Sequence, residues 1–215
     1  MSRTKYDRQL QNLNDTLIEM AGVVESAIND ATRALVEKDI ALAQKVIDHD
    51  DDIDSFEKEI EKHCIDIILR QQPVAGDLRL ISAILKMITD LERIGDHATD
   101  ISEMTTFLAK TEYIKKLVHI PEMAQVACTM LKEGIDAFIR RDVELAKKVI
   151  ADDDKVDEIF IHIKEELIEL IKQDVSNANQ AMDFMMIAKY YERIGDHATN
   201  VAEWAEYAVT GTHEA

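Results

Sequence analysis

The sequence contains few residues that interrupt helices or form cross-links. Its 215 residues include only 6 glycines, 2 prolines and 2 cysteines, and aromatic residues make up 5%. Because glycine and proline are the main helix breakers, their scarcity allows long uninterrupted helices. The two cysteines, Cys64 and Cys128, lack any metal-binding or redox spacing, so we expect them to be buried apolar residues in a reducing compartment.

Positive charge and long apolar runs are also lacking. The formal net charge is −18, which excludes direct nucleic-acid binding because that function needs a basic surface. The first residues, MSRTKYDRQL, have no apolar region of the kind that signal peptides carry, and no run of 18 apolar residues occurs. We therefore predict a cytoplasmic protein without a membrane span.

One octapeptide, ERIGDHAT, occurs twice in the chain. It occupies residues 92–99 and again residues 192–199. A second pair of similar stretches, 39–47 and 142–150, is separated by 103 positions instead of 100. The repeat is too long for a solenoid unit, so we predict two pseudo-symmetric halves, residues 1–110 and 118–215, joined by a connection near 110–120.

Helical periodicity runs through both halves, and no segment alternates as a strand would. Asp39 and Asp77 have the position of N-caps, and Pro73 and Gly76 are expected to end the helix before them. Short turns favour antiparallel neighbours, which predicts an all-α fold of two three-helix bundles. The six expected helices are 5–37, 39–71, 77–109, 119–140, 142–173 and 179–209.

Carboxylates form stripes beside the apolar faces of the second and third expected helices. At about 100° per residue, those of the third helix fall within about 80° of one another. If each hairpin folds about its turn, residues whose numbers add up to about 149 face each other in the first half, and those adding up to about 353 in the second. Asp54 then lies opposite Asp96, and Asp157 opposite Asp196.

Several carboxylates brought together in this way must take up protons or bind cations. Because the donors are oxygens without thiolates, they suit hard cations such as ferric iron, Mn²⁺, Mg²⁺ or Ca²⁺. The predicted metal site residues are Asp50, Asp54, Glu92, Asp96 and Asp100 in the first half, and Asp153, Asp157, Glu192, Asp196 and Asn200 in the second.

The remaining residues of the octapeptide suggest supporting roles. The helical wheel turns His97 and His197 away from the preceding aspartates, so packing is favoured over metal ligation. Arg93 is expected to pair with neighbouring carboxylates. Gly95 costs helix stability relative to alanine, which suggests that its missing side chain allows a helix or an ion to approach closely.

The two acidic groups are not equivalent. The second half has Asn200 in place of Asp100, and Phe160 and Lys164 in place of Glu57 and Glu61. Because the second group carries less negative charge, we expect it to hold fewer ions or to hold them more weakly.

These residues resemble the PhoU family of phosphate-uptake regulators. The resemblance covers nearly the whole chain and rests on the ERIGDHA segments, on RQQPVAGDLR at 70–79 and on the stretches 39–47 and 142–150. The family motif is a repeated Glu/Asp-x-x-x-Asp, and Asn200 breaks the series here. The matching pairs are Asp50/Asp54, Glu92/Asp96, Asp96/Asp100, Asp153/Asp157 and Glu192/Asp196.

The resemblance implies two three-helix bundles that carry multinuclear metal clusters, of iron first, with zinc, manganese, magnesium or calcium as alternatives. It implies a cytoplasmic, often homodimeric adaptor that limits phosphate import and keeps the phosphate-starvation response off. The implied partners are the ATPase subunit of a phosphate ABC transporter and the sensor histidine kinase of the phosphate two-component system.

Two other functions compete with this interpretation. A di-metal carboxylate enzyme in a helical bundle needs Glu-x-x-His pairs, but none of the seven histidines has Glu three residues before it. A metal-free helical adaptor would use the acidic faces only for solubility. Since no Gly-rich phosphate loop or nucleophile–base pair can be placed either, we predict that the protein is not an enzyme.

Overall fold

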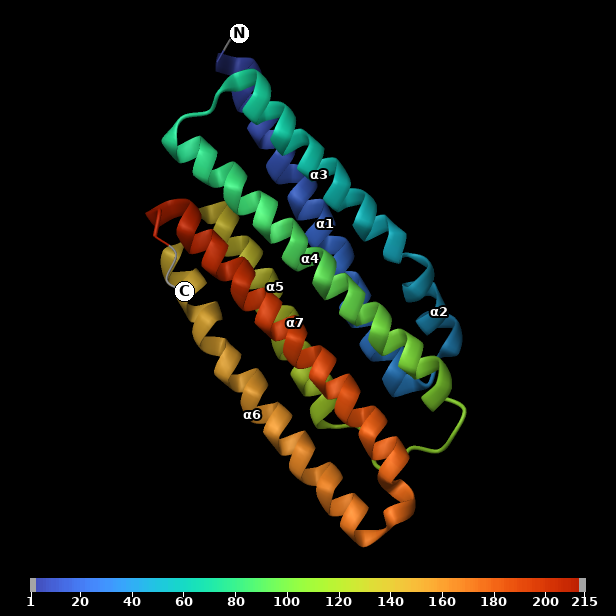
Figure 1. Cartoon of the computed structure of the whole chain (residues 1–215). Coiled ribbons are helices and arrows are strands. Elements are labelled where there is room, and N and C mark those ends of the chain that lie inside the picture. The colour runs from blue at the N-terminus through green and yellow to red at the C-terminus, as the bar shows by residue number, and fades with distance from the viewer. Residues whose placement is uncertain (1–2, 213–215) are drawn as a thin grey trace.

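A computed structural model describes residues 3–212 of the chain, with side chains from residue 6 onward. Within that range the protein is all helical and forms no strand (Figure 1). A 3₁₀ turn, Val175–Asn177, precedes the last helix. The α-helices are α1 Arg3–Glu37, α2 Ile40–Asp48, α3 Asp50–Gln71, α4 Ala75–Leu108, α5 His119–Arg140, α6 Val143–Gln173 and α7 Ala178–Thr210.

The second expected helix, 39–71, was wrong in one respect, because it divides at His49 into α2 and α3. His49 has φ −102° and ψ 7°, and its ring nitrogen Nδ1 lies 2.7 Å from the Lys45 carbonyl oxygen. The break starts a new helix at three consecutive aspartates, residues 50–52. Acidic side chains are favourable in a first turn, where they meet the positive end of the helix dipole.

The N-cap predictions had opposite outcomes. Asp39 caps α2 as predicted, and its carboxylate accepts a hydrogen bond from the Leu42 amide at 3.0 Å. Asp77 does not cap α4, because that helix already begins at Ala75, after Val74. The Asp77 carboxylate instead accepts a hydrogen bond from the Tyr6 hydroxyl at 2.9 Å, which ties the start of α4 to α1.

Each half is a three-helix bundle, as predicted, in which α2 and α3 together take the place of one helix in the first half. The two bundles share one core. Helices α4 and α7 lie side by side through the middle of the molecule, with α1, α2 and α3 on one side and α5 and α6 on the other (Figure 1). Fully buried residues of both halves, including Leu91 and Tyr191, belong to a single apolar cluster. The cysteines are buried as expected.

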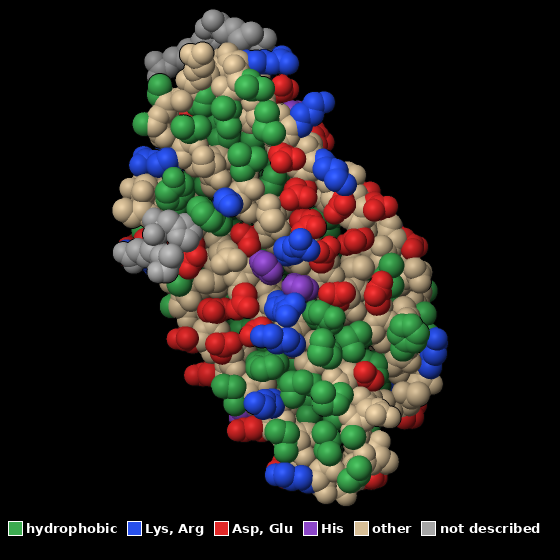
Figure 2. Space-filling view, in the orientation of Figure 1, with side chains coloured by type: hydrophobic (Ala, Val, Ile, Leu, Met, Phe, Trp, Pro, Cys, Tyr) green, Lys and Arg blue, Asp and Glu red, His purple; other side chains and the backbone are tan. Residues whose placement is uncertain are grey.

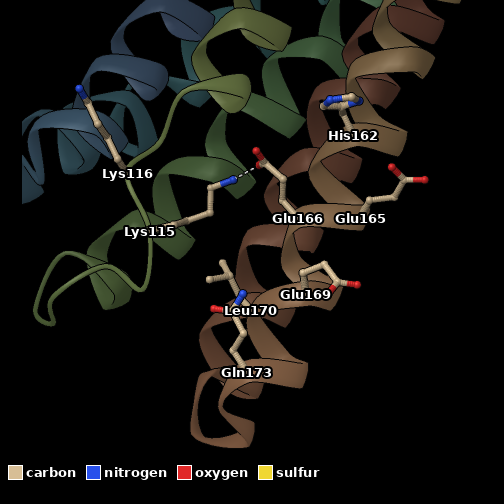
Figure 3. A pocket seen from close by; sticks show the side chains of 8 residues that line it. All are labelled: Lys115, Lys116, His162, Glu165, Glu166, Glu169, Leu170 and Gln173. Atoms are coloured by element: carbon tan, nitrogen blue, oxygen red, sulfur yellow. Dashed lines mark hydrogen bonds and ion pairs between the residues drawn. The ribbon is translucent and has the colours of Figure 1, made fainter.

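The segment 109–118 connects the halves and is anchored by its side chains. Lys115 pairs with Glu166 of α6, and His119 Nδ1 lies 3.0 Å from the other oxygen of that carboxylate. Beside this pair lies an open pocket of about 520 Å³, whose lining combines Lys115 and Lys116 with the acidic face of α6 (Figure 3). No helix of the described residues is both long and apolar enough to cross a bilayer.

Candidate metal centre

Close helix contacts position the acidic side chains of each half. A Cβ atom added to Gly95 of α4 would lie 2.7 Å from Ile53 Cδ1 of α3, and one added to Gly195 would lie 3.1 Å from Val156 Cγ1 of α6. The glycines therefore allow a neighbouring helix to approach, as the sequence suggested. This contact brings the octapeptide in each half next to the aspartates at the start of α3 and in the first half of α6.

In the first half, the start of α3 faces the octapeptide of α4, and the observed contact joins an aspartate to a threonine. The Thr99 hydroxyl donates a hydrogen bond to Asp50 at 2.9 Å, and these residue numbers add up to 149. Burial, followed by the charges of Asp96 and Asp54, raises the pKa of Asp50, and the Thr99 hydrogen bond opposes only part of that rise. Burial and the Asp96 charge likewise raise the pKa of Glu92.

Cationic side chains from the same helices compensate part of this charge. Arg93 Nη1 lies 2.9 Å from Asp96 Oδ2, and Arg93 Nε lies 3.4 Å from Glu92 Oε2, which confirms the expected pairing of Arg93. Lys58 Nζ lies 3.0 Å from Asp54 Oδ2. Because both cationic side chains are more than half exposed, these pairs hold the carboxylates only weakly.

The second half repeats the arrangement with fewer acids. Burial, followed by Asp157, Asp154 and Glu192, raises the pKa of Asp153, and Thr199 at the position of Thr99 opposes part of that rise. Burial, followed by Glu192 and Asp153, raises the pKa of Asp196. The three predicted aspartates and the one predicted glutamate of this half therefore share one electrostatic environment.

Two predicted site residues, Asp100 and Asn200, contact the seam between α4 and α7 instead. Asp100 Oδ2 lies 3.4 Å from His97 Nδ1, and Asn200 Nδ2 donates to Asp90 Oδ1 at 2.9 Å. His197 Nδ1 lies 2.9 Å from the same Asp90 oxygen. In this structure the side chains at positions 100 and 200 are therefore engaged by His97 and by Asp90.

The histidines of the octapeptide pack at this seam, in line with the packing role expected for them. The His97 and His197 rings lie 5.8 Å apart between centroids, and His97 stacks on Tyr190 at 5.6 Å. Burial lowers the pKa of His97, although the Asp100 contact opposes this effect. In Figure 2, acidic side chains gather on both sides of a small area of histidine, lysine and arginine.

The residues fit a hard cation by chemistry and by charge. Their donors are carboxylate oxygens, and the Thr199 hydroxyl beside Asp153 is buried without a hydrogen bond of normal geometry. In the described residues, however, no three His, Cys, Asp or Glu side chains converge closely enough to hold an ion. Cation binding would therefore require the carboxylates to rotate toward one another.

Sequence reasoning missed three residues that the structure places beside the carboxylates. Thr99 and Thr199 end the duplicated octapeptide, and that duplication was a signal that could have identified them. Lys189, whose ammonium pairs with Glu192, stands where the first half has Thr89. No single-chain signal marked it, because lysine on a helix surface is common.

The fold and the site define a class of protein: a paired three-helix bundle whose two acidic faces are related by internal pseudo-symmetry. The family model for the PhoU domain matches residues 17–105 and again residues 120–205. The chain belongs to the PhoU family.

Several relatives share the full length of the chain. A phosphate-specific transport system accessory protein PhoU homolog of Clostridium acetobutylicum is 38% identical over 98% of this chain and 97% of its own length. The Aquifex aeolicus homolog of the same name is 42% identical, over 88% of this chain and 86% of its own length. These names describe accessory proteins and not enzymes, in agreement with the prediction for this chain.

Solved structures show the same fold. The crystal structure of PhoU from Pseudomonas aeruginosa matches with a TM-score of 0.92 and 36% identity, over 96% of this chain and 100% of that chain. The phosphate transport system regulatory protein PhoU from Streptococcus pneumoniae matches with a TM-score of 0.88 at 24% identity, over 98% of this chain and 99% of that chain, and this second likeness supports the fold alone.

Proposed function

We propose that this protein is an accessory regulator of phosphate transport that acts as an adaptor. The observation that carries the proposal is the similarity to phosphate-specific transport system accessory proteins, at 38% identity over 98% of the chain and at 42% over 88%. The proposed partners are the ATPase subunit of a phosphate ABC transporter and the sensor histidine kinase of the phosphate two-component system. The proposed setting is the cytoplasm, with the chain as a homodimer.

A deletion strain tests this role. Loss of the gene in its source organism should raise phosphate uptake and switch on phosphatase expression while phosphate is plentiful. Reintroducing the intact gene should restore both to their normal levels. A deletion strain with unchanged uptake and unchanged phosphatase expression would show that the chain does not regulate phosphate transport.

We further propose that each acidic group holds a multinuclear cluster, with iron as the first candidate metal. The ligands would come from Asp50, Asp54, Glu92, Asp96 and Asp100 in the first half, and from Asp153, Asp157, Glu192, Asp196 and Asn200 in the second. The proposal is supported by the raised pKa values of Asp50, Glu92, Asp153 and Asp196, whose causes include neighbouring carboxylates. A bound cation would neutralise that repulsion and fix the helix hairpins.

Metal titration tests the clusters. The apoprotein should show two unequal classes of sites for iron or Mn²⁺, with the tighter class lost in Asp96→Asn and the weaker class lost in Asp196→Asn. A matched control is Asp66→Asn, because Asp66 of α3 pairs with Arg70 and lies outside both groups. Protein purified without chelator that contains no metal, and binds none at saturating supply, would favour the metal-free adaptor.

A further inference from the structure

The pseudo-symmetry of the chain makes the two ends of the molecule comparable. Lys38 follows α1 and Arg141 follows α5, 103 positions later, and both have left-handed backbones with φ of 58° and 55°. The amide after each, of Asp39 and of Asp142, bonds a carbonyl five residues earlier at 2.9 Å. The same backbone geometry is therefore built twice, once at each end of the α4–α7 pair.

At the Lys38 end, the connecting segment is bound between helices. Lys38 Nζ donates to the Thr111 carbonyl at 3.0 Å and to the Glu112 carboxylate at 3.1 Å. Gln180 Nε2 donates to the Glu112 carbonyl at 3.1 Å, and Gln180 Oε1 accepts a hydrogen bond from the backbone amide of Ile114 in the same segment. The Tyr113 hydroxyl donates to the Leu35 carbonyl at 2.8 Å. Three residues, Lys38, Gln180 and Leu35, thus bind a segment of the connection that contains one glutamate, Glu112.

At the opposite end, the equivalents of these three residues line a cavity of about 160 Å³. Arg141 corresponds to Lys38 and Phe138 to Leu35 at the offset of 103, and Leu80 corresponds to Gln180 at the offset of 100. The start of α4 and the ends of α5 and α7 enclose this cavity, so both halves of the chain contribute to it. Its volume suits a single side chain.

The charge of this cavity is unusual for so acidic a protein. Half-buried Arg79 and exposed Arg141 both line it. Among residues 6–212, the arginines that pair with carboxylates are others, namely Arg33, Arg70, Arg93 and Arg140. The Nε atom of Arg79 is buried and has no hydrogen-bond partner there. Asp77 is the acidic residue of the lining, and its carboxylate already accepts the Tyr6 hydroxyl. Among residues 6–212, these two cationic groups therefore have no anionic partner, in a cavity that adjoins apolar Phe138.

We propose that this cavity is a docking site for a segment of a partner protein that carries a Glu or Asp, whose carboxylate would lie between Arg79 and Arg141. The bound segment 111–114 at the other end provides the template, since there the ammonium of Lys38 donates to the exposed carboxylate of Glu112. Charge-assisted hydrogen bonds to arginine are stronger and more directional than those to lysine. The site does not involve the proposed metal ligands.

A peptide copied from the template provides the probe. The acetylated amide AKTEYI reproduces residues 109–114, and its binding to the ¹⁵N-labelled full chain can be followed by amide shift changes. We expect saturable shifts confined to residues 76–80, 138–141 and 208–211, with a Kd on the order of 1 mM. The peptide AKTQYI, which lacks the carboxylate, should bind at least about tenfold more weakly.

Variants then test the two arginines. Arg79→Gln and Arg141→Asn should each weaken AKTEYI binding by about tenfold or more, and Asn suits the left-handed backbone at 141. Arg140→Gln is the matched control, because Arg140 is exposed and pairs with Asp136. The amide spectrum of each variant checks its fold, and Arg141→Asn keeps the test available if Arg79→Gln does not fold.

Three results would overturn the proposal. The first is an absence of shifts at 10 mM peptide. The second is that inorganic phosphate produces the same shifts at lower concentration than the peptide, which would make the cavity a phosphate site. The third is that AKTEYI binds only to a chain shortened after Thr212, which would assign the cavity to the chain's own last residues.

Discussion

Lys189 and Glu192 form an ion pair at 2.5 Å on α7, in the middle of the second acidic group. The first group has no such internal cation at the equivalent place, because residue 89 is threonine and its hydroxyl donates to Glu57. Lys189 also lies 5.7 Å from the ring centre of Phe160, the residue that replaces Glu57 in the second half. At two adjoining positions the second group therefore gains a positive charge, at Lys189, and loses a negative one, at Phe160.

An exchange of these residues should change the metal affinity of each group in opposite directions. Lys189→Thr removes a cation that competes with the metal for Glu192. It should therefore tighten metal binding to the second group by about tenfold, which corresponds to about 1.4 kcal/mol. Thr89→Lys should weaken binding to the first group by a similar factor. Calorimetric titration of each variant measures both classes, and Lys86→Thr is the control, since that lysine lies near Trp204. Unchanged affinities in both exchanges would exclude a role for Lys189.

The space around Gly95 and around Gly22 predicts that alanine at these two positions changes the stability of the protein in opposite directions. Gly95→Ala should destabilise the protein by ~1–3 kcal/mol, because the new methyl group overlaps a packed side chain. Gly22→Ala should stabilise it by ~0.5–1 kcal/mol, because that exposed helical glycine has no atom within 4 Å of an added Cβ. Urea unfolding monitored by circular dichroism measures both.

A compensating substitution makes the first of these results specific. Ile53→Val removes the Cδ1 atom that the added methyl group would meet, so it should recover part of the loss in Gly95→Ala. If the double variant is no more stable than Gly95→Ala alone, the clash is not the cause of the loss.

The cysteines should resist thiol reagents in the folded protein. Burial raises the pKa of Cys64 to about 12 and that of Cys128 to about 11. At pH 8 both thiols are therefore protonated and shielded, and the thiolate is the reactive form. Titration with an aromatic disulfide reagent should find no fast-reacting thiol at pH 8 and two thiols in 6 M guanidinium chloride. One fast-reacting thiol in the folded chain would contradict this burial.

The attachment of the connecting segment to α6 should depend on pH. Although burial opposes the effect, the hydrogen bonds from Lys115 and His119 lower the pKa of Glu166. Because the folded pKa is depressed, this stabilisation is present above the ordinary glutamate value of about 4.3 and is lost as the pH falls through the lower, folded value. Glu166→Gln should therefore be less stable than the parent at pH 7, by no more than ~1 kcal/mol for so accessible a pair.

The same comparison at pH 3 should show a smaller difference between Glu166→Gln and the parent. The control is Glu169→Gln, since Glu169 lies one turn further along α6 (Figure 3) and, among the described residues, pairs with the exposed Lys172. A difference that is equally large at both pH values would show that the carboxylate charge is not what holds the segment.

Much of the architecture could be predicted because it depends on local patterns. The apolar period of three to four residues gave the helices, and Pro73 marked a turn, since both signals depend on neighbours within a few positions. The position of that turn also predicted which stretches of α3 and α4 face each other, although the hydrogen bond from Thr99 to Asp50 was not predicted. The break at His49 could not be predicted in this way, because the same residues would also suit one continuous helix.

The sequence alone determined the duplication, the helical class and the presence of two unequal acidic groups, because repeated letters, periodicity and charge can be read along the chain. Only the tertiary structure decided that Asp100 and Asn200 contact the α4–α7 seam and that Arg79 shares a cavity with Arg141. Those contacts join residues from different helices, and their geometry depends on how α4 packs against α5 and α7. The directions of side chains across a helix interface are set by that packing, which no local pattern encodes.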